Sequence, residues 1–279
     1  VLISQDIPAK TTYSELNTTQ ERIYFGESTD TYAVVNTKTD EFDYPSGDNN
    51  MENQYDGTAG IPLTLYNRIA FSMSNATLKF LLSSDVTSDS RIIINRNVVQ
   101  RVEKIAPFFT YDNDPYLVTV DGKLYWIVDA LTTSDKYPYS EPTSDGYNYI
   151  RNPVKVVIDA YNGDVTYYLV DPTDPIAASY AKIYPDLFKS YDEMPSEIKA
   201  HLRYSEDLFS VQADMYATYH MSNTTVFYNK EDVWNIAKQY YQTSNEAVAV
   251  NPTYLIMKLP DRSEEFLLVI PYTPQNKDN

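Results

Sequence analysis

Two short turns constrain the fold of this chain more than any other feature of its sequence. They are Asp121-Gly122 and Asn162-Gly163. Both central residues of a type I′ turn need a positive φ angle, which Asp, Asn and Gly adopt more readily than other residues. Each turn separates two runs rich in alternating apolar residues, 116–120 and 123–130 around the first, 154–160 and 164–170 around the second. The sequence therefore predicts two antiparallel hairpins in the middle of the chain.

Helical periodicity is found before and after these hairpins. Apolar residues recur at spacings of three and four from Leu63 to Leu82, and a second helix is predicted from a cap at Ser88 or Asp89 to Ile105. Further helices are predicted at 174–184, at 196–202, at 206–221 with Ser205 as the cap, and at 230–241. Strands are expected at 22–25 and 31–36, a polar loop at 43–60, and a last hairpin at 253–259 with 264–270.

Helices and antiparallel hairpins thus occur in blocks, which predicts an α+β fold in which β-hairpins pack with several helices. Because helices precede hairpins both in 63–170 and in 174–270, two similar helix-plus-hairpin lobes are an alternative arrangement. We divide the chain into an N-terminal extended segment, 1–62, a segment with helices and two hairpins, 63–172, and a segment with helices and a C-terminal hairpin, 173–279. The alternative is one compact unit.

Charge and composition exclude several classes of protein. The chain has 22 Lys and Arg against 39 Asp and Glu, a net charge of −17, and this disfavours nucleic acid, whose phosphates are bound by basic side chains. The same charge disfavours contact with anionic lipid unless divalent cations intervene. There is no cysteine, so a disulfide scaffold and a thiol enzyme are both excluded. No apolar run approaches the ~18 residues typical of a membrane-spanning helix.

The sequence contains no assembled catalytic signature. Its two histidines, His201 and His220, lie beside no Gly-x-Ser-x-Gly elbow, and its seven glycines form no phosphate-binding loop. Enzymatic chemistry is therefore the less favoured interpretation.

Acidic loops nevertheless offer candidate ligands for a hard divalent cation. If these loops share one rim of the fold, five carboxylates converge, those of Asp85, Asp89, Asp112, Asp114 and Asp135. Such oxygen ligands suit Ca²⁺ or Mg²⁺, and a metal bound there could support a hydrolase or transferase. The alternative is that the same Asp residues and their Ser neighbours cap helices and close turns.

Tyrosine is the one marked excess, with 27 residues. Its ring combines a flat apolar face with a hydrogen-bonding tip, which suits sugar and peptide surfaces. Most of these tyrosines are expected to fill strands and core edges, as their β propensity predicts. The long loop from residue 137 to residue 151 is the exception, and we predict a ligand there, bound by Tyr137, Tyr139, Tyr147, Tyr149 and Arg151.

Long stretches of the chain also resemble a known family. They include RIYFGE (22–27), LLSSDVTSDSR (81–91), NVVQRVEKIAPFFTYDNDPYLVTVDGKLYWIVDA (97–130), NYIRNPVKVVIDAYNGDVTYYLVD (148–171) and VFYNKEDVW (226–234). From about Arg22 to Asn279 the sequence resembles uncharacterised protein family 0182 of prokaryotes. The resemblance implies a multi-pass cell-membrane protein whose N-terminal spanning helices precede a large extracytoplasmic region. This chain would be a soluble part of that region, with the N-terminal transmembrane region as a partner. The resemblance implies no reaction and no catalytic residues.

Three functions follow as hypotheses. The leading one is an extracytoplasmic domain that binds or senses an envelope sugar, an envelope peptide or a partner protein. The second is a metal-assisted hydrolase or transferase that acts on cell-envelope material through the acidic loops. The third is a structural spacer, for which no ligand is expected.

Overall fold

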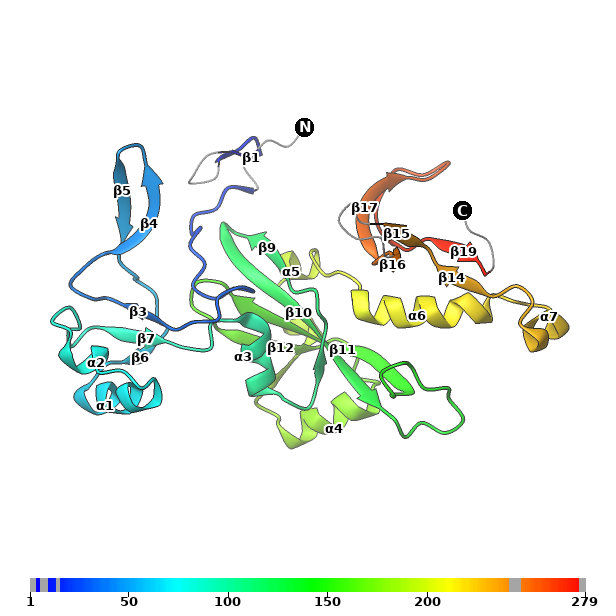
Figure 1. The fold of residues 1–279 in the computed structure, drawn as a ribbon, viewed down its shortest axis with the longest axis horizontal. Helices are drawn as coiled ribbons and strands as arrows, with labels where there is room; N and C mark the ends of the chain where they lie inside the picture. Colours follow the sequence, from blue (N-terminus) through cyan, green and yellow to red (C-terminus); the bar gives the residue numbers. More distant parts are fainter. Residues whose placement is uncertain (1–3, 6–9, 14–15, 241–246, 276–279) are drawn as a thin grey trace.

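A six-stranded sheet built on the predicted hairpins forms the centre of the protein (Figure 1). The computed structural model describes residues 4–5, 10–13, 16–240 and 247–275. The two longest strands, β10 (Lys123–Ser134) and β11 (Tyr149–Asp159), pair antiparallel in the middle of the sheet. On one side β10 pairs with both β8 (Thr110–Tyr111) and β9 (Tyr116–Val120), and on the other side β11 is followed by β12 (Val165–Leu169) and a parallel strand, β13 (Phe188–Ser190).

The first of the two predicted turns has the positive φ angles expected of a type I′ turn at both central residues, and the second has one at a single residue. Asp121 and Gly122 both adopt positive φ angles, of 50° and 74°, as a type I′ turn requires. In the second hairpin only Gly163 does so, with φ of 70°. There the Asp159 side chain accepts hydrogen bonds from the backbone of Tyr161 and Asn162, both at 2.8 Å, so the turn is longer than two residues.

Alternation along the central strands gives the sheet two buried faces. Val128 of β10 and Val156 of β11 pack in one cluster with helix α3 (Val98–Ile105) and helix α4 (Pro175–Ile183). Their neighbours Ile127 and Val157 point to the other face, because successive side chains of a strand alternate between faces. That second face is covered by helix α5 (Ser196–Lys199), which follows a short 3₁₀ turn, Tyr191–Glu193.

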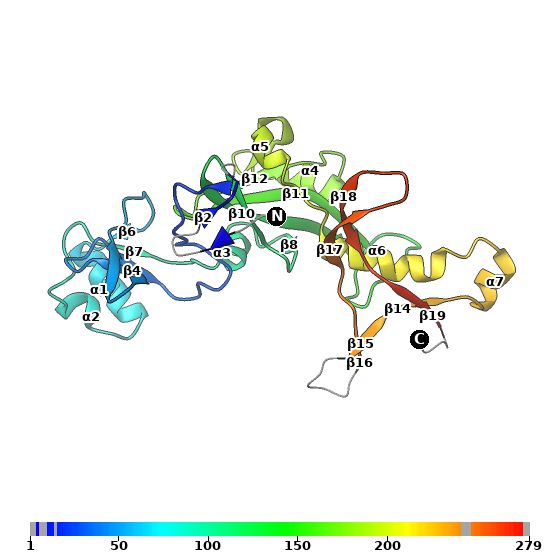
Figure 2. The same cartoon turned by 90° about the horizontal axis from the view of Figure 1, so that it is seen from above.

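An N-terminal lobe extends from one end of this sheet (Figures 1 and 2). It contains a three-stranded sheet, two helices and a separate hairpin, with a small core of Leu63, Phe80 and Ile92. Its elements are β3 (Ala33–Val35), β4 (Glu41–Ser46), β5 (Asn49–Asn53), β6 (Ile61–Pro62), α1 (Leu65–Ser74), α2 (Lys79–Leu82) and β7 (Arg91–Ile93). Before them, β1 (Ser4–Gln5) pairs with β2 (Lys10–Thr11).

The C-terminal elements lie at the opposite end in both views (Figures 1 and 2). Helix α6 leads into them, and Trp234 packs against Tyr272 with ring centroids 5.5 Å apart. The elements are α6 (Glu206–Tyr219), α7 (Thr224–Asn229), β14 (Trp234–Ile236), β15 (Lys238–Tyr240), β16 (Ala247–Ala249), β17 (Thr253–Lys258), β18 (Glu264–Val269) and β19 (Tyr272–Pro274). Among the described residues, no helix has the length and apolar character needed to cross a membrane.

The α+β class is confirmed, and so are the three predicted hairpins. Ser205 caps α6 as predicted, accepting a hydrogen bond from the backbone N–H of Leu208 at 3.0 Å. Asp174 caps α4 in the same way, through the N–H of Ala177. The division of the chain at residues 62 and 172 stays a prediction.

Several local predictions were wrong where distant residues decide the structure. Neither Ser88 nor Asp89 caps a helix, because residues 91–93 pair with β3 and β6, and α3 begins only after Asn97. The helix predicted at 230–241 is absent up to Tyr240, since Lys230 ends α7 in the left-handed conformation and β14 pairs with β19. Tyr241 lies outside the described residues. Residues 22–25 form no strand, and most of the hairpin β4–β5 lies within the predicted polar loop, 43–60.

Candidate functional site

The loop between β10 and β11, residues 135–148, forms one wall of a groove. The Asn148 side chain holds this loop in shape, since its Nδ2 donates to the carbonyl oxygens of Tyr137 at 2.8 Å and Ser140 at 3.1 Å. Its Oδ1 accepts from the backbone N–H of Tyr137 at 3.0 Å. Further along, the Thr143 N–H donates to the Tyr147 carbonyl at 2.8 Å. The loop is therefore a hydrogen-bonded structure, as a binding wall needs to be.

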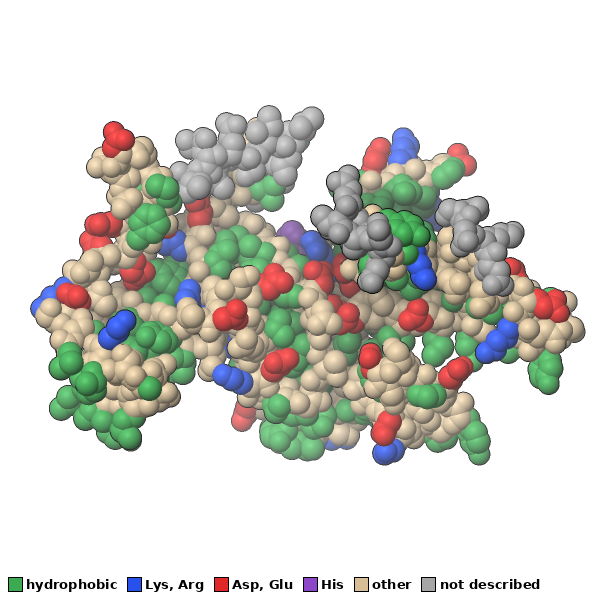
Figure 3. All heavy atoms as spheres, viewed as in Figure 1, with side chains coloured by type: hydrophobic (Ala, Val, Ile, Leu, Met, Phe, Trp, Pro, Cys, Tyr) green, Lys and Arg blue, Asp and Glu red, His purple; other side chains and the backbone are tan. Residues whose placement is uncertain are grey.

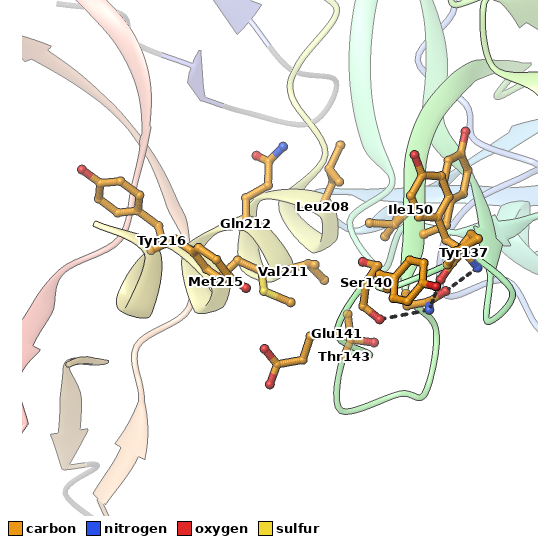
Figure 4. Close-up of a pocket in the computed structure, with 15 residues that line it drawn as sticks. Tyr137, Ser140, Glu141, Thr143, Ile150, Leu208, Val211, Gln212, Met215 and Tyr216 are labelled. Atoms are coloured by element: carbon orange, nitrogen blue, oxygen red, sulfur yellow. Dashed lines mark hydrogen bonds between the residues drawn. The ribbon is translucent and has the colours of Figure 1, made fainter. Parts of the chain in front are cut away.

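Helix α6 forms the facing wall (Figure 4). The groove has a volume of about 770 Å³. Its helical lining repeats at spacings of three and four, which places one face of α6 toward the loop. These side chains are Leu208, Val211, Gln212, Met215, Tyr216 and Tyr219.

Two tyrosines of the loop, Tyr137 and Tyr139, line the groove together with Tyr149 at the start of β11. Tyr137 and Tyr149 stack with ring centroids 5.8 Å apart and an interplanar angle of 22°, and Tyr139 is fully exposed. The Tyr149 hydroxyl donates to the buried carboxylate of Asp174, which also caps α4. Burial, and then this hydrogen bond, raises the pKa of the Tyr149 hydroxyl, so its proton stays in place and fixes the ring.

The groove continues along α6 toward the end of the helix. A second hollow of about 460 Å³ shares Glu141, Thr143 and Met215 with the first and reaches Asp214 and Lys230. Among the described residues that line the first hollow, Glu141 is the one charged side chain. The site is therefore elongated, largely apolar and weakly acidic.

The predicted ligand residues divide into two groups. Tyr137, Tyr139 and Tyr149 line the groove. Tyr147 does not line it, and its hydroxyl lies 3.3 Å from a carboxylate oxygen of Asp145. Arg151 forms an ion pair with Asp171 and donates to the hydroxyl of Thr173 at 3.1 Å, so its guanidinium is engaged with the start of α4.

Sequence reasoning missed the wall formed by α6. The apolar residues of this helix recur at spacings that also describe a core-facing helix, and Tyr216 and Tyr219 are more than half exposed. The groove-lining residues of α6 could have been found from the sequence, because the helix has more apolar positions than one buried side needs. The buried residues of the helix are Leu208, Ala213 and Ala217, so most of the other apolar residues had to face another surface.

The five carboxylates predicted for a metal lie in different parts of the fold. Asp85 and Asp89 lie in the turns before β7, Asp112 and Asp114 lie beside the start of α6, and Asp135 pairs with Lys136 beyond β10. Within the described residues, no group of three or more Asp, Glu or His side chains is arranged to hold a metal ion.

Asp112 instead connects the central sheet to α6. Its backbone N–H donates to the Asp129 carbonyl at 2.9 Å, and its carboxylate accepts from the Ser205 hydroxyl and from the N–H of Asp207. Beneath this link, Asp129 and Lys155 form a buried ion pair between β10 and β11, and Lys155 also donates to the Arg203 carbonyl at 2.8 Å. The hydrogen bonds of Asp112 and the contact of Lys155 with Arg203 together hold the N-terminal end of α6 in place, and α6 forms one wall of the groove.

Neither histidine is among the residues that line the two hollows. His220 stacks on Trp234 at a centroid distance of 3.6 Å, its Nδ1 lies 3.1 Å from the Tyr216 carbonyl, and its Nε2 lies 3.9 Å from a carboxylate oxygen of Asp232. His201 lies exposed in the turn after α5.

Comparison with known proteins places these observations in a family. The model of the uncharacterised protein family UPF0182 matches residues 1–279. Among similar curated proteins, a UPF0182 protein of Alkaliphilus metalliredigens is 54% identical over 95% of this chain and 28% of its own length. One from Methanospirillum hungatei is 47% identical over 99% of the chain and 31% of its own length. The chain thus spans about three tenths of the length of these relatives. No solved structure matches.

Proposed function

The chain belongs to the uncharacterised protein family UPF0182, and we propose that it is a non-enzymatic domain that binds a saccharide of the cell envelope. The observation that carries this proposal is the groove between the β10–β11 loop and α6, with its stacked Tyr137 and Tyr149. The volume of about 770 Å³ lies within the ~300–1,000 Å³ of small-molecule sites.

The chemistry of the lining favours a sugar chain. Tyrosine rings offer flat apolar faces to the C–H faces of pyranose rings, and their hydroxyls reach polar substituents at the edge. Gln212 supplies an amide on the helical side and Ser140 a hydroxyl on the loop side. Because the second hollow extends the site along α6, a ligand of several linked rings uses it better than a single sugar.

The charge of the groove lining and of the whole chain indicates which kinds of saccharide are favoured. The described lining of the first hollow holds Glu141 and no Lys or Arg, and the whole chain has a net charge of −17. A field of this sign repels carboxylated or phosphorylated sugars and attracts amino sugars. The proposed ligand is therefore an uncharged or cationic oligosaccharide.

Calorimetric titration with three oligosaccharides of equal length tests the proposal. An uncharged N-acetylglucosamine tetramer and its cationic glucosamine counterpart should bind with dissociation constants in the micromolar to millimolar range. A tetramer of galacturonic acid should bind at least ~10-fold more weakly, a difference of about 1.4 kcal/mol. Failure of all three saccharides to bind contradicts the proposal. Binding of a basic peptide in their place would assign the groove to a peptide, and no binding at all would favour the spacer.

We expect Tyr139→Ala to lower the affinity for the uncharged tetramer at least ~5-fold, since aromatic contacts are prominent among energetic hot spots of binding surfaces. Tyr139 is fully exposed, so the free energy of unfolding should change by less than about 0.5 kcal/mol. The matched control is Tyr228→Ala, because Tyr228 is 86% exposed and lies outside the groove lining. Equal losses in both variants would show that the loop is not the binding wall.

The family resemblance also supports a proposal about location. We propose that this segment lies on the outer side of the cell membrane in the full-length protein. The chain contains no cysteine, so Ser263→Cys in the exposed β17–β18 turn introduces a single thiol in this segment. In intact cells, a membrane-impermeant maleimide should label the full-length variant more than the parent protein. Labelling that appears only after permeabilisation would place the segment in the cytoplasm.

A further inference from the structure

Apolar side chains that the fold leaves unburied gather on α1 and α2. Figure 3 shows hydrophobic side chains gathered over these two helices, at the lower left of the view. Solvent reaches 71% of Leu65, 79% of Tyr66, 78% of Met73, 63% of Leu78 and 77% of Leu82. Ile69 is 44% exposed between them. We call these six residues the α1–α2 apolar face.

The side chains of this face stay exposed because other apolar residues already fill the core of the N-terminal lobe. Leu63, Phe80 and Ile92 already fill its small core, and Phe71 packs against Phe80 with ring centroids 6.4 Å apart. Leu65, Ile69 and Met73 follow one another at intervals of four along α1 and therefore form a stripe on the opposite side. An apolar stripe that points outward in this way is typical of a surface that is covered in use.

The charge of this region differs from that of the rest of the chain. Acidic residues number 39 of 279, yet none occurs from Gly57 to Ser84. The two charged residues of that stretch are Arg68 and Lys79. Arg68 donates to the carbonyl oxygens of Leu63, Val86 and Thr87, and Lys79 is exposed next to Leu78. No carboxylate of this stretch has to be desolvated when the face is covered.

We propose that the α1–α2 apolar face docks on the surface of a lipid bilayer with zwitterionic headgroups. Leucine and methionine side chains would enter the boundary between headgroups and acyl chains, while the Tyr66 hydroxyl and the Lys79 ammonium stay at headgroup level. A zwitterionic surface is favoured because the net charge of −17 opposes an anionic one. The same charge on two copies disfavours a second molecule of this chain as the occupant. The inference does not depend on the saccharide groove.

Flotation of the chain with phosphatidylcholine vesicles at 150 mM salt tests the proposal. The informative variant is Leu65→Glu with Met73→Glu, at two exposed helix positions where glutamate is well tolerated. The matched control is Tyr228→Glu with Ile256→Glu, because these residues are 86% and 74% exposed away from the face and the change in charge is identical. Circular dichroism and thermal melting verify that each variant is folded.

We expect the parent chain and the control to float with the vesicles, and the α1–α2 variant to bind at least ~10-fold less lipid. Absence of the parent chain from the vesicle fraction overturns the proposal, as does an equal loss in the control. A concentration-dependent dimer that the α1–α2 variant abolishes, without vesicle binding, would assign the face to a second copy. The saccharide affinity of the α1–α2 variant should match that of the parent, so the two proposals fail separately.

Discussion

Replacing Lys155 by methionine should lower the free energy of unfolding by about 3–5 kcal/mol at pH 7, the usual cost of removing one partner of a buried ion pair. Lys155 and Asp129 have 8% and 4% of their side-chain surface exposed, so Lys155→Met leaves a buried carboxylate without its cation. The variant also loses the hydrogen bond from Lys155 to the Arg203 carbonyl. Urea unfolding followed by circular dichroism measures the change.

The loss should depend on pH in a defined direction. Burial raises the pKa of the Asp129 carboxyl, and Lys155 opposes that rise. Without Lys155 this pKa rises further, and the folded state then binds a proton more strongly than the unfolded state does. Stability of the variant relative to the parent should therefore fall as the pH rises through the folded pKa, and recover as the pH is lowered from 7 toward 5. A difference that stays constant over that range would contradict this account.

A double variant separates the charge from the packing. Asp129→Leu with Lys155→Met removes both charges, and well-packed apolar replacements of buried pairs are often neutral or stabilising. We expect the double variant to regain most of the stability that Lys155→Met loses. If both variants are equally unstable, the unpaired carboxylate is not the cause of the loss.

The parts of the fold that could be predicted are those specified by neighbouring residues. Asp121-Gly122 determines its own backbone angles, and Ser205 and Asp174 cap helices that begin beside them. The failures involve distant partners. Trp234 lies in a stretch with helical spacing, but it pairs with Pro274, and Ile92 pairs with Val34 and Ile61. Single-sequence periodicity contains no information about such pairings, so strand and helix remain indistinguishable there.

The candidate site also combines features that neighbouring residues specify with features that depend on distant partners. A long segment with several tyrosines is a local signal, and the structure stacks two of them, Tyr137 of the loop and Tyr149 at the start of β11. The role of α6 depends on the loop that faces it, which the sequence does not show. Asp112 illustrates the converse, because a carboxylate that suits a cation is used here to hold Ser205 and Asp207 at the start of α6.

Gly163→Ala should destabilise the protein by about 2–5 kcal/mol, because two costs act together at this position. Gly163 has a φ of 70°, and a residue with a Cβ atom there loses roughly 1–2 kcal/mol. An added Cβ would also lie 2.5 Å from ring atoms of Phe25, and overpacking of this kind typically costs ~1–3 kcal/mol. The ring cannot retreat easily, since Phe25 is buried and the Arg101 guanidinium lies 4.7 Å from its centroid.

Gly146→Ala is the matched control for Gly163→Ala. Gly146 has a φ of 87°, and an added Cβ would meet nothing within 4 Å, so this variant should show the backbone cost of roughly 1–2 kcal/mol alone. Adding Phe25→Leu to Gly163→Ala should relieve part of the clash. The summed stability losses of Gly163→Ala and Phe25→Leu should then exceed the loss of the double variant, and the difference is the coupling energy between the two positions. Denaturant unfolding of the parent chain, these three variants and Gly146→Ala measures all of these losses. Additive losses, or equal costs at Gly163 and Gly146, would show that the approach of Phe25 does not restrict residue 163, and that the Asn162-Gly163 turn is specified by its backbone angles alone.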